Sequence, residues 1–237
     1  MLKTLDLNQV MVIDIETVPQ YANYDEVPQN LQDLWEQKTH YQRKADQSAD
    51  DFYEKAGILA EFGKIVCISM GIFYTQNKVQ CLRIKSISGD DERLVLQEFA
   101  NLLNKQPAAL QFCAHNGKEF DFPYLCRRLL VNEIEIPAQL QISGKKPWEV
   151  THIDTMELWK FGDYKHYTSL NLLAAIFNVP TPKDDIDGSM VRQVYYEEKN
   201  LPRIVTYCQK DVITTAQVLL KFKGMKIISS ENITIVT

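Results

Sequence analysis

Three separated segments of the chain carry side chains that could together hold hard divalent cations. They are 14–16, 116–121 and 207–211, and they supply the carboxylates of Asp14, Glu16, Asp121 and Asp211 and the hydroxyl of Tyr207. Carboxylate oxygens are the ligands that Mg²⁺ prefers, and a pair of such cations can promote the hydrolysis of a phosphodiester. The residue types therefore favour nucleic-acid hydrolysis as the first hypothesis.

Spacing alone does not single out these acids, because one acid lies two residues from another at five places. The pairs are Asp14/Glu16, Asp90/Glu92, Glu119/Asp121, Glu133/Glu135 and Asp185/Asp187. The first pair ends the apolar run 10–15, which predicts a buried strand in which both side chains point to the same side. Two unpaired carboxylates there would be costly without a cation. The alternative is a strand that runs into solvent, with both acids hydrated.

The pair Tyr207 and Asp211 is one of two matches to its spacing, because Tyr21 and Asp25 stand equally far apart. The earlier match lies in polar, proline-flanked sequence, whereas 200–221 predicts a helix. Residues four apart share one face of a helix, so the tyrosine hydroxyl could hold a water near the aspartate. The alternative is a half-buried tyrosine beside a solvated aspartate.

The middle segment, 115–121, follows a predicted strand and opens a predicted helix. Asp121 could be a metal ligand there, or it could cap that helix. Lys118 could contact phosphate or be a solvated loop lysine, and His115 fits hydrogen bonding at a strand end better than catalysis. Further along, 145–148 could touch a single strand through Trp148, or it could be an exposed loop around a packed tryptophan.

The elements that must position these residues follow from hydrophobic periodicity and turn residues. Strands are predicted at 10–15, 64–74, 79–85, 108–114 and 153–154, and helices at 91–105, 122–131, 169–177, 189–199 and 200–221. The polar stretch of about 20–61, with helical patches at 28–44 and 49–59, is predicted to be an insertion, and the tail of about 225–237 is β-like. Arg127 and Arg128 are expected on a solvated helix face. Asp154 could support the metal ligands from outside, or it could simply be an acid at a strand end. The order predicts one domain over 1–237, an α/β fold with a mixed sheet flanked by helices.

Composition and charge narrow the class of protein. The chain has 237 residues, of which 45% are hydrophobic and 24% charged, as in ordinary soluble globular proteins. A net charge of −5 is unusual for a simple nucleic-acid-binding module, whereas two bound divalent cations would offset four site carboxylates. With no membrane-length apolar run and no signal peptide, we expect a cytoplasmic protein with five reduced cysteines.

Taken together, the three segments resemble the motifs of the DEDD superfamily of 3′–5′ exonucleases, especially the proofreading exonuclease domain of family B DNA polymerases. Asp14-Ile15-Glu16-Thr17 resembles the first motif, and 116–121, an asparagine followed by an aromatic residue and an aspartate, resembles the second. The third, 207–211, has the tyrosine form, since Thr206 stands where the histidine form would place its histidine. The resemblance covers roughly 8–222 and suggests a stand-alone bacterial relative.

This resemblance implies a ribonuclease-H-like fold and catalysis with two Mg²⁺ or Mn²⁺ ions. It assigns Asp14 to both ions, Glu16 and Asp211 to one of them, and Asp121 to the second, largely through water. Tyr207 and Glu16 would orient the attacking water. All five residues are thus candidate catalytic residues.

By the same resemblance, Thr17, Val18, Asn116 and Phe120 would position the terminal nucleotide. The leading hypothesis is an enzyme that hydrolyses the 3′ end of single-stranded or frayed DNA to nucleoside 5′-monophosphates, away from membranes, with a replication or repair protein as a further partner. Two alternatives stay open. One is an RNA-processing 3′–5′ exoribonuclease, because the chemistry is shared. The other is a non-catalytic nucleic-acid-binding domain of the same fold.

Overall fold

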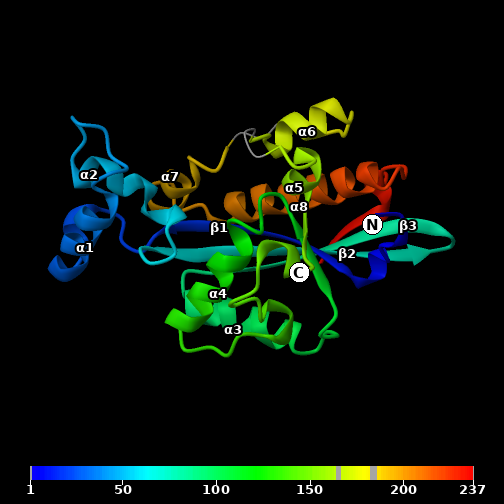
Figure 1. The fold of residues 1–237 in the computed structure, drawn as a ribbon, viewed down its shortest axis with the longest axis horizontal. Helices are drawn as coiled ribbons and strands as arrows, with labels where there is room; N and C mark the ends of the chain where they lie inside the picture. The colour runs from blue at the N-terminus through cyan, green and yellow to red at the C-terminus, as the bar shows by residue number, and fades with distance from the viewer. Residues whose placement is uncertain (1, 164–166, 182–185, 237) are drawn as a thin grey trace.

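A six-stranded mixed sheet runs through the centre of the molecule in the order β5-β4-β1-β2-β3-β6 (Figure 1). The computed structural model describes residues 2–163, 167–181 and 186–236. Its strands are β1 Val10–Pro19, β2 Gly63–Gln76, β3 Val79–Ser88, β4 Gln111–Ala114, β5 Ile153–Asp154 and β6 Ile233–Val236. β1, β2 and β3 form an antiparallel meander, and β4, β5 and β6 add parallel pairs. The predicted α/β fold with a mixed sheet is confirmed.

Helices cover both faces of this sheet (Figure 1). They are α1 Gln29–Thr39, α2 Ala49–Phe52, α3 Glu92–Leu103, α4 Asp121–Val131, α5 Thr155–Lys160, α6 Leu170–Ile176, α7 Val191–Tyr196 and α8 Leu201–Phe222. α3 and α4 lie on one face, and α7 and α8 lie on the other. α8 contacts β1, β2 and β3 along its length. None of the described helices is both long and apolar enough to cross a membrane.

Alternation along β1 decides which face each of its side chains meets. Ile13 and Ile15 pack into the core against α3 and α4, whereas Val12 packs against α8. Because successive side chains of a strand point to opposite faces, Asp14 and Glu16 continue on the α8 face. The fold therefore directs both acids toward the longest helix.

β1 extends further than the sequence predicts. A strand at 10–15 closed by Thr17-Val18-Pro19 is expected, but pairing with β2 continues to Pro19. The register shifts between Glu16 and Thr17, and such an irregularity bends a strand. Pro19 is tolerated because it is the last residue of β1, where the hydrogen bonding between the strands does not need its missing N–H. The acids consequently lie within the strand rather than at its solvent end.

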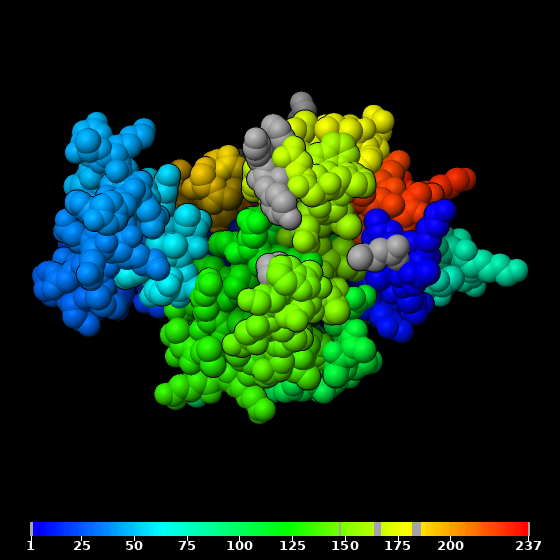
Figure 2. Space-filling model, viewed as in Figure 1, coloured from blue at the N-terminus to red at the C-terminus, as the bar shows by residue number. Residues whose placement is uncertain are grey.

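The insertion between β1 and β2 has a core of its own. Trp35 of α1 is fully buried, and its ring centroid lies 5.9, 5.4 and 5.0 Å from those of Phe52, Tyr53 and Phe62. Its Nε1 donates a hydrogen bond to the backbone oxygen of Ala49 at 2.8 Å. In the space-filling view the insertion stands out as a lobe at one end of the molecule (Figure 2).

Local hydrogen bonds explain where the helices differ from expectation. The patch predicted at 49–59 is one turn of α-helix, α2, followed by a 3₁₀ helix over Tyr53–Ile58. α5 is not predicted from the sequence. It begins after Asp154, whose carboxylate accepts hydrogen bonds from the backbone nitrogens of Met156 and Glu157. The β-like tail pairs with β3 as β6.

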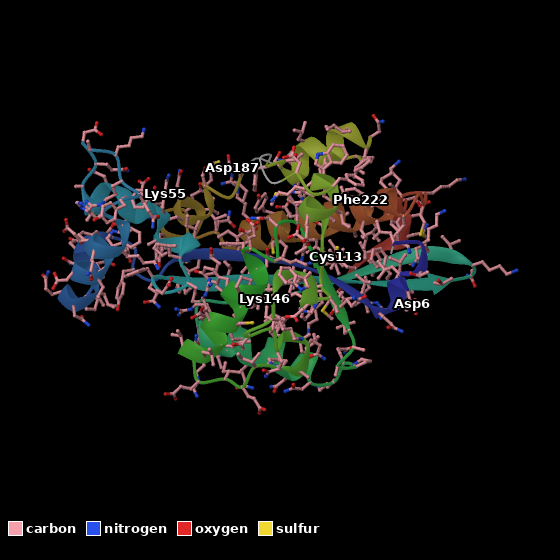
Figure 3. The ribbon with its side chains drawn as sticks, in the orientation of Figure 1. Asp6, Lys55, Cys113, Lys146, Asp187 and Phe222 are labelled. Atoms are coloured by element: carbon pink, nitrogen blue, oxygen red, sulfur yellow. The ribbon has the colours of Figure 1, made fainter. Side chains whose placement is uncertain are left out.

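The interior holds thiols and one buried ion pair as well as apolar side chains. Cys113 of β4 is fully buried in the central part of the molecule, whereas Asp187 lies near its upper edge (Figure 3). All five cysteines are free thiols, as the sequence predicts. Arg128, expected on a solvated face of α4, is 3% exposed and pairs with Glu92 of α3 at 2.6 Å. The solvated position is therefore wrong for Arg128, because its partner comes from another helix, whereas Arg127 is exposed as predicted.

Candidate metal centre

Asp14 and Glu16 of β1 present two carboxylates on one face of the sheet, opposite Ser69 and Cys67 of β2. Glu16 is 6% exposed, and no hydrogen bond or ion pair to another described residue satisfies its carboxylate. The Oδ2 atom of Asp14 is likewise buried without a partner. Buried anions are stable only when they are paired or coordinated. The solvated alternative for this pair is therefore wrong, and a bound cation would offset the charges of both carboxylates.

Asp211 and Tyr207 reach the same place from α8, one helical turn apart. The Tyr207 hydroxyl is hydrogen-bonded to Asp211. Burial, followed by the charges of Asp211, Glu16 and Asp14, raises the pKa of Tyr207 far above its ordinary value. The tyrosine is therefore protonated at neutral pH and acts as a hydrogen-bond donor rather than a base.

Asp121 adds a fourth carboxylate as the first residue of α4. Its Oδ1 accepts a hydrogen bond from the backbone nitrogen of Ile15 at 3.2 Å, so it touches β1 between the first two acids. The helix cap is Phe120, which makes no side-chain capping bond, and the capping interpretation of Asp121 is wrong. Burial, with a further contribution from the charge of Asp154, raises the pKa of Asp121 to about 7.

The carboxylates are close enough to raise one another's pKa. Burial is the largest cause for Asp14, followed by the charges of Asp211 and Asp121, and burial followed by Asp14 and Asp211 does the same for Glu16. Ligand atoms of Asp14, Glu16 and Cys208 lie within 4.8 Å of one another. A divalent cation would satisfy the orphaned Oδ2 and offset the repulsion. The donor set therefore fits oxygen-preferring ions such as Mg²⁺ or Mn²⁺.

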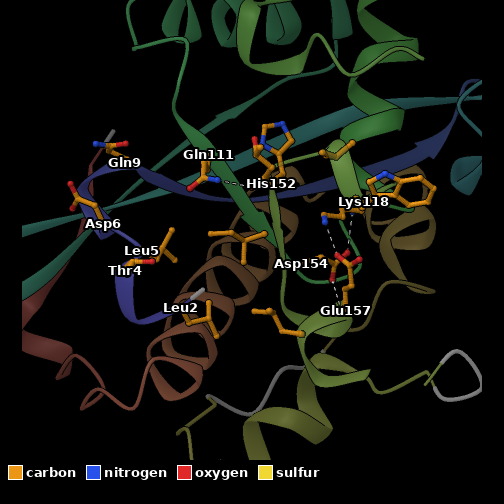
Figure 4. A pocket seen from close by; sticks show the side chains of 15 residues that line it. Leu2, Thr4, Leu5, Asp6, Gln9, Gln111, Lys118, His152, Asp154 and Glu157 are labelled. Atoms are coloured by element: carbon orange, nitrogen blue, oxygen red, sulfur yellow. Dashed lines mark hydrogen bonds and ion pairs between the residues drawn. The ribbon is translucent and has the colours of Figure 1, made fainter. Parts of the chain in front are cut away.

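Asp154 holds the loop that carries the second motif. Its Oδ1 accepts a hydrogen bond from the backbone nitrogen of Asn116 at 3.0 Å, and its Oδ2 accepts one from that of Lys118 at 3.1 Å. Figure 4 shows Asp154 beside Lys118 and Glu157. The Lys118 ammonium pairs with Glu157 at 2.7 Å, so the expectation of a solvated lysine is wrong. Asp154 is at the end of β5, as predicted, and from there it fixes the backbone of this loop.

Two further features fix the same loop. His115 is hydrogen-bonded through both ring nitrogens, to Oγ1 of Thr155 and to the backbone oxygen of Thr168, each at 2.9 Å. This is the strand-end role that the sequence predicts. Gly117 passes so close to β4 that an added Cβ would lie 2.4 Å from the Cβ of Ala114. A side chain at this position would displace the loop.

Comparison with known proteins identifies a family and a similar fold. Residues 51–232 match a family described as a predicted 3′–5′ exonuclease related to the exonuclease domain of PolB. The chain belongs to this family. The matched range contains Asp121, Tyr207 and Asp211, and it begins after Asp14 and Glu16. The fold brings that earlier pair into the exonuclease-like region.

The fold is also similar to that of a solved polymerase, the family B DNA polymerase from the hyperthermophilic archaeon Pyrobaculum calidifontis. The TM-score is 0.53, with 16% sequence identity over 90% of this chain. The chain corresponds to 24% of the polymerase chain, so it spans about a quarter of that protein. At this identity the likeness concerns the fold, which is ribonuclease-H-like as expected.

The four residues expected to contact nucleic acid, and Trp148, differ in how far their side chains are accessible to a ligand. Asn116 has a φ of 64°, a strained backbone, and its Oδ1 is buried without a partner. Phe120 and Thr17 are half-buried, whereas the side chain of Val18 is fully buried in the core, leaving only its backbone for a ligand. Trp148 is 79% exposed, so the packed alternative for this tryptophan is wrong.

Cys208 is a residue of the centre that the sequence does not single out. It follows Tyr207 on α8 and is fully buried. Its Sγ donates a hydrogen bond to the backbone oxygen of Asp14 at 3.4 Å. Cys208 and the buried Val212 lie on one face of α8, and this spacing is the signal that could have placed the thiol against the sheet. The thiol ties α8 to β1 beside the carboxylates.

Proposed function

We propose that this protein is a metal-dependent exonuclease that hydrolyses phosphodiester bonds at the 3′ end of DNA and releases nucleoside 5′-monophosphates. The observation that carries the proposal is the meeting of Asp14, Glu16, Asp121, Tyr207 and Asp211 from β1, α4 and α8. Membership of a family of predicted 3′–5′ exonucleases supports the same reaction and direction. DNA is the proposed substrate because the related domain is that of a DNA polymerase.

Each residue has a role that its surroundings support. Asp14 would serve two Mg²⁺ or Mn²⁺ ions, with Glu16 and Asp211 completing the ligands of one and Asp121 facing the other. Once bound, the cations would stabilise charge on the attacking and leaving oxygens of the phosphodiester. The protonated Tyr207 hydroxyl, whose proton faces Asp211, would accept one hydrogen bond from the attacking water, and Glu16 would accept the other, so that both would orient the water.

Single strands or frayed ends are the proposed substrates because the carboxylates are largely buried. Glu16 and Asp121 are both more than nine-tenths buried, so the reacting linkage must enter the centre of the molecule. A paired 3′ end would first have to separate from its complement, which costs unstacking and unpairing energy.

The test is digestion of end-labelled DNA and RNA, single- and double-stranded, in the presence of Mg²⁺, Mn²⁺ or EDTA. We expect single-stranded DNA to give products shortened from the 3′ end with either metal and none with EDTA. A clear preference for RNA would replace this proposal with the exoribonuclease. The absence of nucleotide release from all substrates, together with no thermal shift on adding Mn²⁺, would leave a non-catalytic binding domain.

A further inference from the structure

A pocket of about 400 Å³ lies where β1 leaves the sheet and the insertion begins. Its walls come from the first residues of the insertion, the start of β2, the segment before α3, and α7 with the loop that follows. Lys64 and Lys199 both line it. Burial lowers the pKa of Lys64, the charges of Asp90, Glu92 and Asp91 oppose this shift, and the charge of Lys199 adds to it. Two ammonium groups thus face one cavity.

Neither Lys64 nor Lys199 forms an ion pair with a carboxylate among the residues that the structure describes. Lys64 Nζ donates a hydrogen bond to the Tyr195 hydroxyl at 3.0 Å, and Lys199 Nζ lies 5.6 Å from the ring centroid of Tyr196. Other cations on α5, α7, α8 and the loop after β4 do pair with glutamates: Lys160, Arg192, Arg203 and Lys118. The two lysines of the pocket therefore differ from these four cations, because their only polar contacts within the described residues are those of Lys64, to the Tyr195 hydroxyl and to the backbone oxygen of Asp90 at 3.5 Å.

The two acids that line the pocket have other hydrogen-bond donors. Asp90 accepts a hydrogen bond from the Tyr195 hydroxyl at 2.7 Å. Glu26 accepts one from Nδ2 of Asn23 at 2.8 Å. Their charges reduce the positive potential of the pocket, but neither carboxylate forms an ion pair with Lys64 or Lys199. Both lysines can therefore still contact a bound anion.

The position of the pocket relates it to the metal centre. Lys64 is the strand partner of Val18, four residues beyond Asp14 on β1, which corresponds to roughly 13 Å along a strand. The Tyr196 hydroxyl donates a hydrogen bond to the backbone oxygen of Pro19 at 2.6 Å and so ties α7 to the end of β1. A single strand whose last nucleotide lies at the carboxylates would reach this pocket within a few nucleotides.

We infer that this pocket binds the phosphate backbone of the single strand behind its 3′ end, with Lys64 and Lys199 contacting phosphate. The inference rests on the proposed function and deepens it by adding a second subsite. Four carboxylates repel a polyanion, and a chain with a net charge of −5 needs local cations to hold one. The first residues of the insertion then have a role, because they form one wall of that subsite.

Fluorescence anisotropy of a single-stranded DNA with hydrolysis-resistant phosphorothioate linkages at its 3′ end, in Mg²⁺, tests the inference. We expect Lys64→Gln/Lys199→Gln to raise the Kd about tenfold or more, and to reduce the slope of log Kd against log salt by about 1.4. The matched control is Lys105→Gln/Lys226→Gln, which removes the same charge from two exposed lysines elsewhere. We expect that control to stay within about twofold of wild type.

Two further measurements keep the outcomes separate. Lys64→Arg/Lys199→Arg preserves both charges, so it should retain binding and thereby exclude a general folding defect. If the glutamine variant bound DNA as tightly as the control, the inference would be overturned. Hydrolysis of thymidine 5′-p-nitrophenyl phosphate by the wild-type protein reports the chemistry alone. Its failure would contradict the proposed function, while the anisotropy comparison would still decide the pocket.

Discussion

The carboxylate of Asp121 accepts a hydrogen bond from the backbone nitrogen of Ile15 at 3.2 Å, across 106 residues of sequence. Ile15 separates Asp14 from Glu16 on β1, so this contact brings the start of α4 to the strand that carries the first two acids. α8 approaches from the opposite face of the sheet with Asp211. The centre therefore exists only when three elements are packed together.

The metal-free protein should lose stability as the pH rises above about 6.5. The pKa of Asp121 is raised to about 7, and burial holds the pKa of Asp14 and Glu16 well above its ordinary range. Such acids bind more protons in the folded than in the unfolded state, so stability falls as the pH rises from their unfolded pKa of about 4 to their folded pKa. We expect the Tm in EDTA to fall by several degrees between about pH 6.5 and pH 8.

Titration of the buried histidines does not obscure this trend above about pH 6.5. His115 and His152 have lowered pKa values because they are buried, and they oppose the trend only below about 6.5, where the unfolded histidines take up protons. Asp121→Asn removes one titrating group and should flatten the dependence. A Tm that rises with pH in EDTA over this range would contradict the prediction.

Tyr207→Phe should reduce turnover without abolishing metal binding. The substitution removes the hydroxyl that is hydrogen-bonded to Asp211 and keeps the ring and all four carboxylates. We expect kcat to fall by roughly 10- to 100-fold, as when one positioned hydrogen-bonding group is lost, with the Mn²⁺-induced thermal shift retained. The control is Tyr41→Phe, which changes a tyrosine that is 94% exposed. If Tyr207→Phe kept the kcat of the wild type, the proposed role of the hydroxyl in the mechanism would be contradicted.

Gly117→Ala should disturb both the fold and the site. The added Cβ would lie 2.4 Å from the Cβ of Ala114 and 3.0 Å from the Phe122 ring, so the loop before α4 must move. We expect a loss of about 1–3 kcal/mol in urea unfolding and lower nuclease activity. Gly188→Ala is a matched control, because nothing lies within 4 Å of its added Cβ. Equal stability of the two variants would show that the loop relaxes freely.

The buried pair of Arg128 and Glu92 should matter far more for stability than a surface pair. Arg128 also donates a hydrogen bond to the backbone oxygen of Ala60, which joins α4 to the end of the insertion. Removing Arg128 leaves the buried charge of Glu92 without a partner, so Arg128→Ala should lower the free energy of unfolding in urea by about 3–5 kcal/mol. Lys85→Ala breaks the exposed pair with Glu98 and should cost less than about 1 kcal/mol. Similar costs would contradict a structural role for the buried pair.

Local patterns predict the parts of the site that lie within one element. Alternation along β1 predicts that Asp14 and Glu16 share a face, and helical spacing predicts that Tyr207 and Asp211 do. Both are confirmed because period-2 and period-3.6 geometry depends on neighbours in sequence. The acid pair containing Glu92 has the same spacing as the first, yet Glu92 belongs to an ion pair with a residue of another helix.

Contacts between elements could not be predicted in this way. The hydrogen bond from Ile15 to Asp121 and the ion pair of Lys118 with Glu157 join residues far apart in sequence. α5, which supplies Glu157, has six residues, too few for a hydrophobic period to identify it. Asp185, one member of the five acid pairs, lies outside the described residues.

The most direct test of the central claim is nucleotide release from single-stranded DNA by wild-type protein, Asp14→Asn and Asp211→Asn in Mg²⁺. We expect each variant to lose at least about 100-fold in activity, with Glu135→Gln, in an exposed acid pair, as the control. In EDTA, Asp14→Asn should unfold at a Tm no lower than that of the wild type, because a repelling buried charge is gone. Activity of either folded variant within a few-fold of wild type would contradict a carboxylate metal centre as the catalytic site.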